Sequence, residues 1–486
     1  MRATLISEPL VPESDAPSLY QKRIPIFTRS VKGKFRTFKW AMMALAYSVY
    51  FGLPWLPWQR GHEAASQAVL FDLPGRKFYL FDLVVYPQDI FWLSLLLFIA
   101  GALLFFATGL IGRAFCGYFC FQTLWTDAFI AIERLVQGER PARQRLYKQS
   151  WNAEKIGKIG LTHLMWLAWA FWTAFTFVLY YGYAPDLTVQ FFTGKAPSVA
   201  YFTTLILTLT TYVAAGWARE QVCLYMCPYA RFQGVMYDPE TLAVAYDSRR
   251  GEGATGRAVP RAGLRTLEER KAKGHGDCID CKLCVQVCPT GIDIRNGLQY
   301  QCIACGLCID ACDNMMDSMG YPRGLIRYDS EANLSAAVPS KPRLHWKRLK
   351  IIGWGLALVI MSGALISSIG HRTSLDAAVQ QVRQPLFVLL SDGQIRNRYQ
   401  IRITNKGVED EIYAITTKGV PDAALDMGNF REVKVHAGKS LIVQASVMLP
   451  QEMAEHATNF EFVVTPKSQP AQAVTLATRF DYKHDE

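Results

Sequence analysis

Histidine is scarce in this sequence of 486 residues, which contains eight of them. A haem b held between membrane helices normally needs two facing histidines as iron ligands. The long uncharged segments of the chain contain only His163. The sequence therefore disfavours a membrane-bound haem.

Two other features are absent. The first residues, MRATLISEPLVPESDAPSLY, have no apolar core, so we expect no cleavable signal peptide and expect the first membrane helix to act as its own signal anchor. The Gly-rich stretch GEGATG at 251–256 lacks the GK[ST] of a phosphate-binding loop. Nucleotide binding at that stretch is therefore not expected.

Charged residues make up only 19% of the chain, and hydrophobic residues make up 51%. Five uncharged segments are long, and a helix needs about 20 apolar residues to cross a bilayer core of about 30 Å. The alternative is a set of buried helices in a globular core, but such helices rarely run this long without a charge. The sequence thus predicts five transmembrane helices, at 40–59, 90–112, 159–185, 196–218 and 351–370.

Lysine and arginine are distributed unevenly between the flanking segments. Eight precede the first predicted helix and eight lie in 113–158, whereas 60–89 has three and 186–195 has one. By the positive-inside rule the N-terminus, 113–158 and 219–350 are cytoplasmic, and the chain from residue 371 is periplasmic in a bacterial inner membrane. The net charge of +11 reflects this bias toward anionic membrane lipid, so we expect no nucleic-acid partner.

All twelve cysteines lie in segments predicted to be cytoplasmic, where thiols stay reduced. Eight of them form CIDCKLCVQVCP (278–289) and CIACGLCIDACD (302–313), both with C-x2-C-x2-C-x3-C spacing, in which the fourth cysteine binds the cluster of the other motif. Zinc is the alternative metal, but two tandem motifs in this register favour clusters. Asp313 stands where a proline is expected, which affects the local turn but not ligation. The spacing predicts two [4Fe-4S] clusters, the first on Cys278, Cys281, Cys284 and Cys312 and the second on Cys302, Cys305, Cys308 and Cys288.

The other four cysteines form a repeat, since two predicted spans precede CGYFC and two more precede CLYMCP. If these segments are helical, the thiols at i and i+4 share one face of the helix. If the helix instead breaks, Pro228 starts a new helix and Cys227 lies at its N-terminus. The helix dipole there, together with Arg113 and Arg219, favours the thiolate form. Thiolates favour Cu(I) over Cu(II). The alternative is that cysteine is simply a small apolar residue at a helix end. We predict a copper and thiol redox site formed by Cys116, Cys120, Cys223 and Cys227.

Short alternating segments follow the last predicted helix, including RYQIRIT, EIYAITT, EVKV, LIVQASVML and FEFVV. They predict an antiparallel β-sandwich of immunoglobulin-like type over 371–486. This segment has no cysteine, and its histidines are scattered, so neither a disulfide nor a metal site is expected there: His371, His436, His456 and His484. It is expected to bind an extracytoplasmic partner, with a passive cap as the alternative.

The predicted fold is a multidomain membrane protein with a five-helix α transmembrane bundle, an α+β two-cluster ferredoxin insert and a C-terminal all-β sandwich. Residues 238–275 are expected to be a linker with one short helix over 264–273. The parts are a cytoplasmic segment 1–39, helices one to four with the two C-x3-C repeats in 40–218, the insert 219–350 with its ferredoxin core at 275–322, helix five at 351–370 and the β-domain 371–486.

Five spans, GRAFCGYFCFQTLWTD, QVCLYMCPYARFQGVMYD, the two cluster motifs and the β-domain together resemble the FixG/CcoG (RdxA) family of cytochrome c oxidase accessory proteins. The resemblance covers nearly the whole chain. It implies assembly of a cbb3-type oxidase, with copper as substrate reduced from Cu(II) to Cu(I). The implied partners are that oxidase or its assembly factors, a copper transporter or chaperone and a cytoplasmic electron donor; a homodimer is compatible with the sequence.

Two other functions stay open. The same residues could form an electron-transfer subunit that connects the quinol pool to a partner, as in the similar NapH and NosR proteins. A quinone site would use the aromatic residues of the third span, although these rings are more simply explained by packing and lipid contact. The third function is a non-catalytic scaffold whose β-domain holds the oxidase while the clusters sense redox state.

Overall fold

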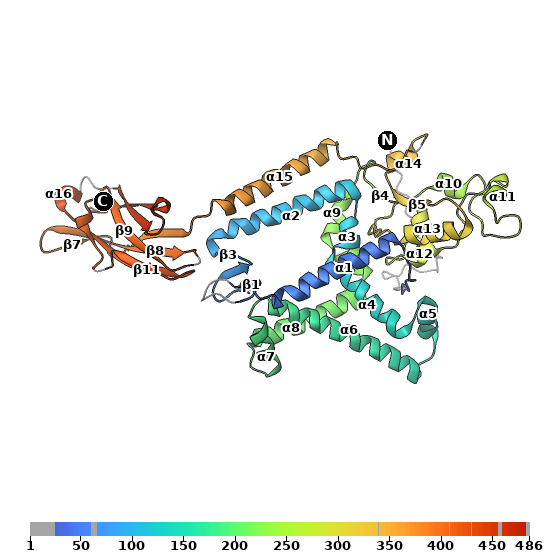
Figure 1. Ribbon diagram of the computed structural model, residues 1–486, viewed down its shortest axis with the longest axis horizontal. Helices are drawn as coiled ribbons and strands as arrows, with labels where there is room; N and C mark the ends of the chain where they lie inside the picture. The colour runs from blue at the N-terminus through green and yellow to red at the C-terminus, as the bar shows by residue number, and fades with distance from the viewer. Residues whose placement is uncertain are drawn as a thin grey trace, which may run out of the picture.

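The computed structural model describes residues 25–59, 66–338, 340–407, 409–428, 430–454 and 459–482. Residues 1–24 of the predicted cytoplasmic segment, in which no cleavable signal peptide is expected, lie outside these ranges, as do Arg60, His456 and His484. The molecule is elongated, with a β-sandwich at one end, long helices in the middle and the cluster motifs at the other end (Figure 1). The order of the parts along the chain is therefore the predicted one.

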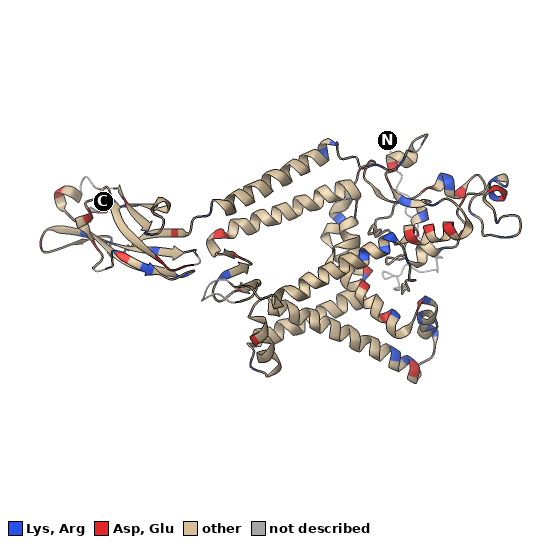
Figure 2. Cartoon of the chain, in the orientation of Figure 1, with Lys and Arg blue, Asp and Glu red and all other residues tan. Residues whose placement is uncertain are grey.

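Helices that run lengthwise form the middle of the molecule. They are α1 (Lys34–Gly52), α2 (Ile90–Ile111), α6 (Ala153–Leu179), α8 (Ser198–Thr211) with its π-helical extension Tyr212–Ala218, and α15 (Leu349–Gly370). Helix α2 packs against α15, and α6 packs against α8 (Figure 1). Lys, Arg, Asp and Glu gather toward the ends of the molecule and are nearly absent from the middle of these helices (Figure 2). Their outward side chains are apolar, as at Phe98 and Val359, which are 69% and 71% exposed. A surface of this kind is stable in lipid and not in water.

Five helices in the described ranges are long and apolar enough to cross a membrane: Pro87–Ile111, Ala114–Gln137, Ala153–Leu179, Ser198–Ala218 and Leu349–Gly370. The predicted number is confirmed, but one member differs. The predicted span 40–59 corresponds to α1, which begins earlier, at Lys34, and ends at Gly52, so its charged first turns exclude it from this set. The segment Ala114–Gln137 takes its place, and the sequence prediction missed it because Asp127 and Glu133 interrupt its apolar run.

The segment Ala114–Gln137 consists of a short helix, α3 (Ala114–Tyr118), and a longer one, α4 (Phe121–Gln137). Its contacts place α4 at the cluster end of the molecule. Asp127 pairs with Arg36 Nη1 at 2.9 Å and with Lys39 Nζ at 3.2 Å, both in the first turns of α1. Gln137 Nε2 donates to Thr162 Oγ1 in the first half of α6. Helix α5 (Arg140–Lys148) follows at the same end (Figure 1).

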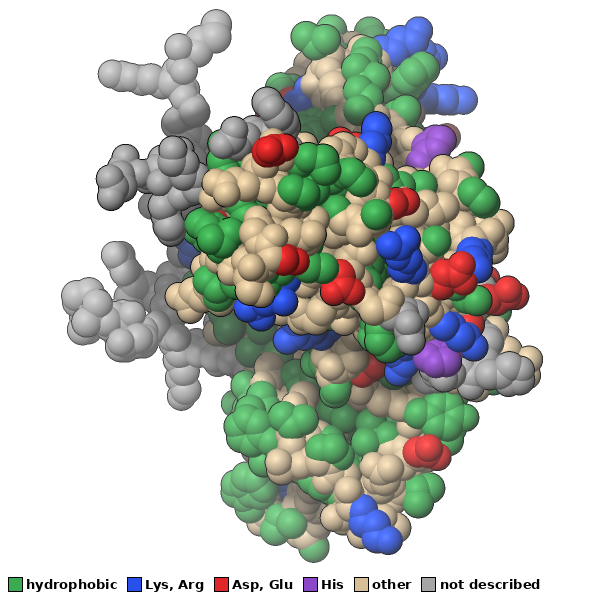
Figure 3. Space-filling model, turned by 90° about the vertical axis from the view of Figure 1, so that its left-hand side faces the viewer, with side chains coloured by type: hydrophobic (Ala, Val, Ile, Leu, Met, Phe, Trp, Pro, Cys, Tyr) green, Lys and Arg blue, Asp and Glu red, His purple; other side chains and the backbone are tan. Residues whose placement is uncertain are grey.

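Small elements connect the helices at the sandwich end. A three-stranded antiparallel sheet is formed by β1 (Val69–Asp72), β2 (Lys77–Leu80) and β3 (Leu83–Val85), and α7 (Ala184–Phe192) follows α6. Seen from the sandwich end, hydrophobic side chains predominate in the lower part of the molecule, below the sandwich (Figure 3). Val189 and Phe192 of α7 are 64% and 65% exposed, as expected for a helix that contacts lipid.

The cluster motifs lie in a compact α+β unit. Strands β4 (Ala243–Tyr246) and β5 (Ile326–Asp329) pair antiparallel. Helices α12 (Leu283–Gln286) and α13 (Leu307–Met319) lie between these strands along the chain. The short helix predicted within 264–273 is confirmed as α11 (Leu267–Ala272), but the rest of 238–275 is not only a linker, because it also supplies β4 and α10 (Ser248–Glu252). Arg270 of α11 is fully buried and donates to the carbonyl oxygens of Gly276 and Cys278.

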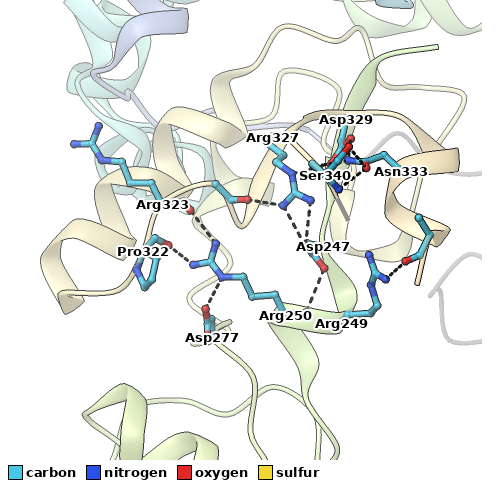
Figure 4. A network of polar contacts seen from close by, with 12 residues as sticks. Asp247, Arg249, Arg250, Asp277, Pro322, Arg323, Arg327, Asp329, Asn333 and Ser340 are labelled. Carbon is cyan, nitrogen blue, oxygen red and sulfur yellow. Dashed lines mark hydrogen bonds and ion pairs between the residues drawn. The ribbon is translucent and has the colours of Figure 1, made fainter. Parts of the chain in front are cut away.

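A network of polar contacts closes this unit (Figure 4). Arg250 Nε donates to Asp277 Oδ2 at 2.5 Å, one residue before Cys278, and Arg250 also binds the carbonyl oxygens of Pro322 and Arg323. Arg327 of β5 joins Asp247, which follows β4, at 3.1 Å. These contacts join the start of the first motif to the end of the domain, and α14 (Glu331–Ser335) follows β5.

Two antiparallel sheets form the C-terminal domain, as predicted. One has the order β10-β12-β8-β6, with β7 against β8, and the other has the order β11-β9-β13-β14. Alternate residues of β8, such as Tyr399, Ile401 and Ile403, are fully buried between the sheets. Strand β6 was not predicted, because LDAAVQQ has little apolar alternation. The bounds are β6 Leu375–Gln381, β7 Val388–Leu389, β8 Gln394–Asn405, β9 Glu411–Lys418, β10 Leu425–Asp426, β11 Glu432–Val435, β12 Ser440–Pro450, α16 Gln451–Ala454, β13 Asn459–Pro466 and β14 Val474–Arg479.

Candidate functional site

Two cavities in the ferredoxin unit correspond to the two predicted cluster sites. The first is lined by Cys278, Cys281, Cys284 and Cys312, and the second by Cys288, Cys302, Cys305 and Cys308, with Cys284 between them. Each predicted set of four thiols thus surrounds a common space, although its members come from both motifs.

The backbone around these cavities suits a cluster. Asp280 and Lys282 of the first motif, and Ala304 and Gly306 of the second, have left-handed conformations with φ between 48° and 70°. These turns direct backbone N–H groups at the sulfurs, with Leu283 donating to Cys281 and Leu307 to Cys305. Hydrogen bonds of this kind tune the potential of an iron–sulfur cluster. The residues present therefore fit the predicted clusters.

Burial raises the pKa of Cys284 and of Cys302 to about 12. The metal-free thiols are therefore protonated at neutral pH, so metal ligation must release protons. Asp313, which replaces the expected proline, lies inside α13 and accepts a hydrogen bond from the Gly324 N–H at 3.0 Å. A proline there would interrupt the helix that carries Cys308 and Cys312.

Each C-x3-C pair lies across a helix break. Cys120 is the N-cap of α4, and Cys227 is the N-cap of α9 (Pro228–Met236). The predicted helix start at Pro228 is confirmed, and the alternative of one continuous helix through each pair is wrong. Cys116 lies in α3, and Cys223 lies in the π-helical turn Val222–Met226.

The two pairs come together at the cluster end of the helices. Cys116 interacts electrostatically with Cys120 and Cys227, and Cys223 interacts with all three other thiols. All four are free and partly buried. In the described ranges no three His, Cys, Asp or Glu side chains converge as they would on one metal ion, so ligation by more than two of these thiols requires side-chain rotation.

Arg113 and Arg219 do not favour thiolate in the way that the sequence predicts. Arg113 interacts with Cys116 and Cys223, but burial and the neighbouring thiols outweigh it and raise the pKa of Cys223 to about 12. Arg219 is bound by the Glu133 carboxylate instead. A thiolate at Cys223 therefore depends on a bound cation and not on these arginines.

The thiol site touches the second cluster motif directly. Cys116 packs against a buried apolar cluster whose members include Ile303 and Cys305 of this motif. A Cβ on Gly117 would lie 2.9 Å from the Ile303 carbonyl oxygen and 3.0 Å from Cys305 Cα. Tyr118 Oη donates to the Cys305 carbonyl oxygen at 2.9 Å. Sequence reasoning missed Gly117 and Tyr118, although both lie between the two cysteines of the repeat.

The start of α1 completes this contact. Asp310 of α13 accepts hydrogen bonds from the backbone N–H groups of Phe35 at 3.2 Å and Arg36 at 2.7 Å. A third cavity, lined mainly by polar side chains, lies between the thiol site and the second motif. Its lining residues are Lys39, Gln122, Thr123, Thr126, Asp127, Arg219, Glu220, Cys223, Pro289, Thr290 and Ile303. The helices and the ferredoxin unit therefore form one continuous site.

His163 is engaged by aromatic neighbours. Its Nδ1 lies 3.0 Å from Tyr212 Oη, and its ring stacks on Trp217 with a centroid distance of 5.6 Å. The aromatic residues of the third predicted span, considered for a quinone site, pack on aromatic rings of neighbouring elements, as Trp166 does on Phe129 of α4 and Phe175 on Phe191 of α7.

Two family models match the chain from residue 218 onward. A family model described as a 4Fe-4S dicluster domain matches residues 218–331, and one for the IG-like fold at the C-terminal of FixG matches residues 365–483. Both agree with the predicted ferredoxin insert and immunoglobulin-like domain.

Three relatives cover most of the chain. Protein RdxB of Cereibacter sphaeroides is 43% identical over 86% of this chain and 86% of its own length. Protein RdxA of the same organism is 44% identical over 82% and 84%. Nitrogen fixation protein FixG of Rhizobium meliloti is 38% identical over 94% and 93%. The crystal structure of a FixG-related protein from Vibrio parahaemolyticus is 21% identical, covers 23% of this chain and all of its own, and has a TM-score of 0.21.

Proposed function

Since this chain belongs to the FixG/RdxA family of membrane iron–sulfur proteins, we propose that it reduces Cu(II) to Cu(I) for assembly of a cbb3-type cytochrome c oxidase. The observation that carries the proposal is the contact of the Cys116–Tyr118 segment, which lies beside the other three thiols, with the second cluster motif. Soft thiolate ligands bind Cu(I) in preference to Cu(II), so a site of this composition favours the reduced ion.

The cysteine sets that line the two cavities would hold two [4Fe-4S] clusters: Cys278, Cys281, Cys284 and Cys312, and Cys302, Cys305, Cys308 and Cys288. When bound, such clusters supply one-electron reducing equivalents. The substrate copper gains one electron and becomes Cu(I), while a cytoplasmic electron donor is oxidised. Cys116, Cys120, Cys223 and Cys227 hold the copper, and the contact of Gly117 and Tyr118 with the second motif keeps them beside it.

The two ends of the molecule have different tasks in this proposal. The ferredoxin unit and the thiol site face the cytoplasm, and the β-sandwich lies in the periplasm, in keeping with the distribution of lysine and arginine. The sandwich would bind the oxidase or an assembly factor, and a copper transporter or chaperone would exchange copper at the thiol site.

The test uses the purified full-length protein with its clusters reduced. Addition of Cu(II) without oxygen should reoxidise the clusters and produce Cu(I), which a chromophoric Cu(I) chelator detects.

A variant with all four substitutions Cys116→Ser, Cys120→Ser, Cys223→Ser and Cys227→Ser should keep the cluster absorption and slow the reaction by more than about 100-fold. The reason is that loss of a group that only supports a metal ligand already costs about 10- to 100-fold in affinity or activity. Cys281→Ser, which removes a proposed cluster ligand, is the control for cluster damage. Copper reduction at the wild-type rate in the fourfold variant would contradict the proposal.

The second candidate is a quinol-linked electron-transfer subunit. An amphipathic cavity of about 630 Å³ favours it, with Phe177, Tyr181, Tyr183, Asp186 and Gln190 among its lining residues. These residues belong to the sandwich end of the helices, opposite the cluster motifs, which argues against direct contact between a quinol and a cluster (Figure 1). Reoxidation of the reduced protein by a quinone but not by Cu(II) would favour this function. If a variant without clusters still supports oxidase maturation, only a scaffold role remains.

A further inference from the structure

Gln233 is a buried polar residue beside the thiol site. It lies in α9, the helix that begins directly after Cys227, and its side chain is fully buried. Its amide Nε2 donates a hydrogen bond to Cys116 Sγ at 3.6 Å. Gln233 therefore connects α9, which follows the second thiol pair, to Cys116 of the first pair.

The other half of this amide has no partner. Gln233 Oε1 is buried and accepts no hydrogen bond in the described part of the chain. Buried polar atoms are nearly always hydrogen-bonded, so an orphaned one indicates a missing partner or a functional role. Two neighbouring groups also have other partners, since Tyr229, which interacts with the Gln233 side chain, binds Thr108 through its Oη, and the Arg113 guanidinium binds the Ala230 carbonyl oxygen.

A side-chain amide can serve a thiol in both of its states. A protonated thiol donates a hydrogen bond and needs an acceptor, which is the amide oxygen, whereas a metal-bound thiolate accepts one and needs a donor, which is the amide N–H. In this structure the N–H faces the sulfur. That is the orientation that a metal-bound Cys116 requires.

We propose that Gln233 is a positioning residue of the copper site, whose N–H stabilises the copper-bound thiolate of Cys116 and so increases the affinity for Cu(I). This inference rests on the proposed function. Cu(I) held by thiolates leaves more negative charge on the site than Cu(II) does, and a fixed N–H dipole aimed at the sulfur stabilises that charge. Gln233 thereby favours the reduced ion without ligating it.

The experiment measures Cu(I) affinity without oxygen by competition with a chromophoric Cu(I) chelator, using the full-length protein with its clusters present. Gln233→Leu removes both polar atoms, and Gln233→Glu keeps the shape but replaces the donor with a carboxylate oxygen. We expect both to lower the affinity by about 10- to 100-fold, with Glu the weaker binder, and to alter the ultraviolet absorption of the Cu(I)–thiolate bonds. Gln137→Leu is the matched control, because that amide binds Thr162 and no thiol, and it should bind Cu(I) as the wild type does.

A double-variant cycle separates this role from packing. If Gln233 acts through the sulfur of Cys116, Gln233→Leu should have little further effect in a Cys116→Ser background. Wild-type affinity in both Gln233 variants, or an equal loss in the two backgrounds, would overturn the role of Gln233 and leave the proposed function intact. A wild-type protein that binds no Cu(I) would overturn the proposed function and this inference together.

Discussion

At the scale of single residues, the thiol site depends on a position without a side chain. Gly117 lies between Cys116 and Tyr118 in α3, where the helix meets the backbone of the second cluster motif. A Cβ at this position would approach three backbone atoms of Ile303, Ala304 and Cys305 at 2.9 to 3.2 Å. Backbone cannot move aside as the end of a flexible side chain can, so only glycine permits this contact.

Gly117→Ala should therefore separate the thiol site from the ferredoxin unit. We expect a destabilisation of about 1–3 kcal/mol, typical of overpacking, and a lower temperature for the loss of cluster absorption from the purified protein. Gly160→Ala is the control, since a Cβ there meets no atom within 4 Å and alanine favours a helix. An unchanged temperature for Gly117→Ala would mean that α3 and the motif shift apart without cost.

At the scale of secondary-structure elements, α4 is unusual because it carries ionised groups in an apolar setting. Asp127 is buried and faces two cations of α1, and Glu133 binds both Arg143 and Arg219. These ion pairs connect α4 to α1, α5 and the end of α8. They hold the elements on which Cys120 and Cys223 lie.

Asp127→Asn should be strongly destabilising. It leaves Arg36 and Lys39 as buried charges without a counter-ion, and breaking a buried ion pair costs about 3–5 kcal/mol. We expect a lower yield of monodisperse protein and a lower midpoint of thermal unfolding. Glu154→Gln breaks an exposed i,i+4 pair with Lys158 and should change the stability by less than about 1 kcal/mol. Equal effects of the two substitutions would show that the buried pair contributes no more than a surface pair does.

At the scale of the whole molecule, a buried carboxylate connects the β-sandwich to the helices. Asp89, directly before α2, lies 3.2 Å from Arg372 Nη2, two residues after α15, and 3.3 Å from Lys406 Nζ in the turn after β8. The Arg372 guanidinium also lies over the rings of Tyr86 and Trp92. One charged cluster thus sets the direction in which the sandwich extends from the bundle.

Lys406→Met should loosen the sandwich without unfolding it. The sandwich keeps its own core, but the ion pair between Lys406 and Asp89, which helps to fix the connection at 371–374, is lost. We expect faster cleavage by a protease at this connection and unchanged cluster absorption. Lys418→Met, at an exposed lysine of the same domain paired with Glu461, should be cleaved as the wild type is. Equal cleavage of both variants would mean that Asp89 and Lys406 do not hold the sandwich.

The sequence by itself determined the features that depend on local pattern. The uncharged runs predict the membrane helices because the bilayer requires a fixed apolar length, and apolar alternation predicts most strands of the sandwich because neighbouring side chains point to opposite faces. Cysteine spacing predicts the two ligand sets because a cluster fixes the distances between its thiolates. Pro228 predicts the helix start at Cys227 because proline fits the first turn of a helix.

Only the tertiary structure decided which distant segments meet. The approach of Cys116 to Cys227, the contact of Gly117 with Ile303 and the hydrogen bond from Gln233 join residues more than a hundred positions apart, and no local pattern encodes them. The pairing of β4 with β5 and the burial of Asp127 depend likewise on packing between elements, because a short strand or a charged residue in a helix has no stable place until its partner is present.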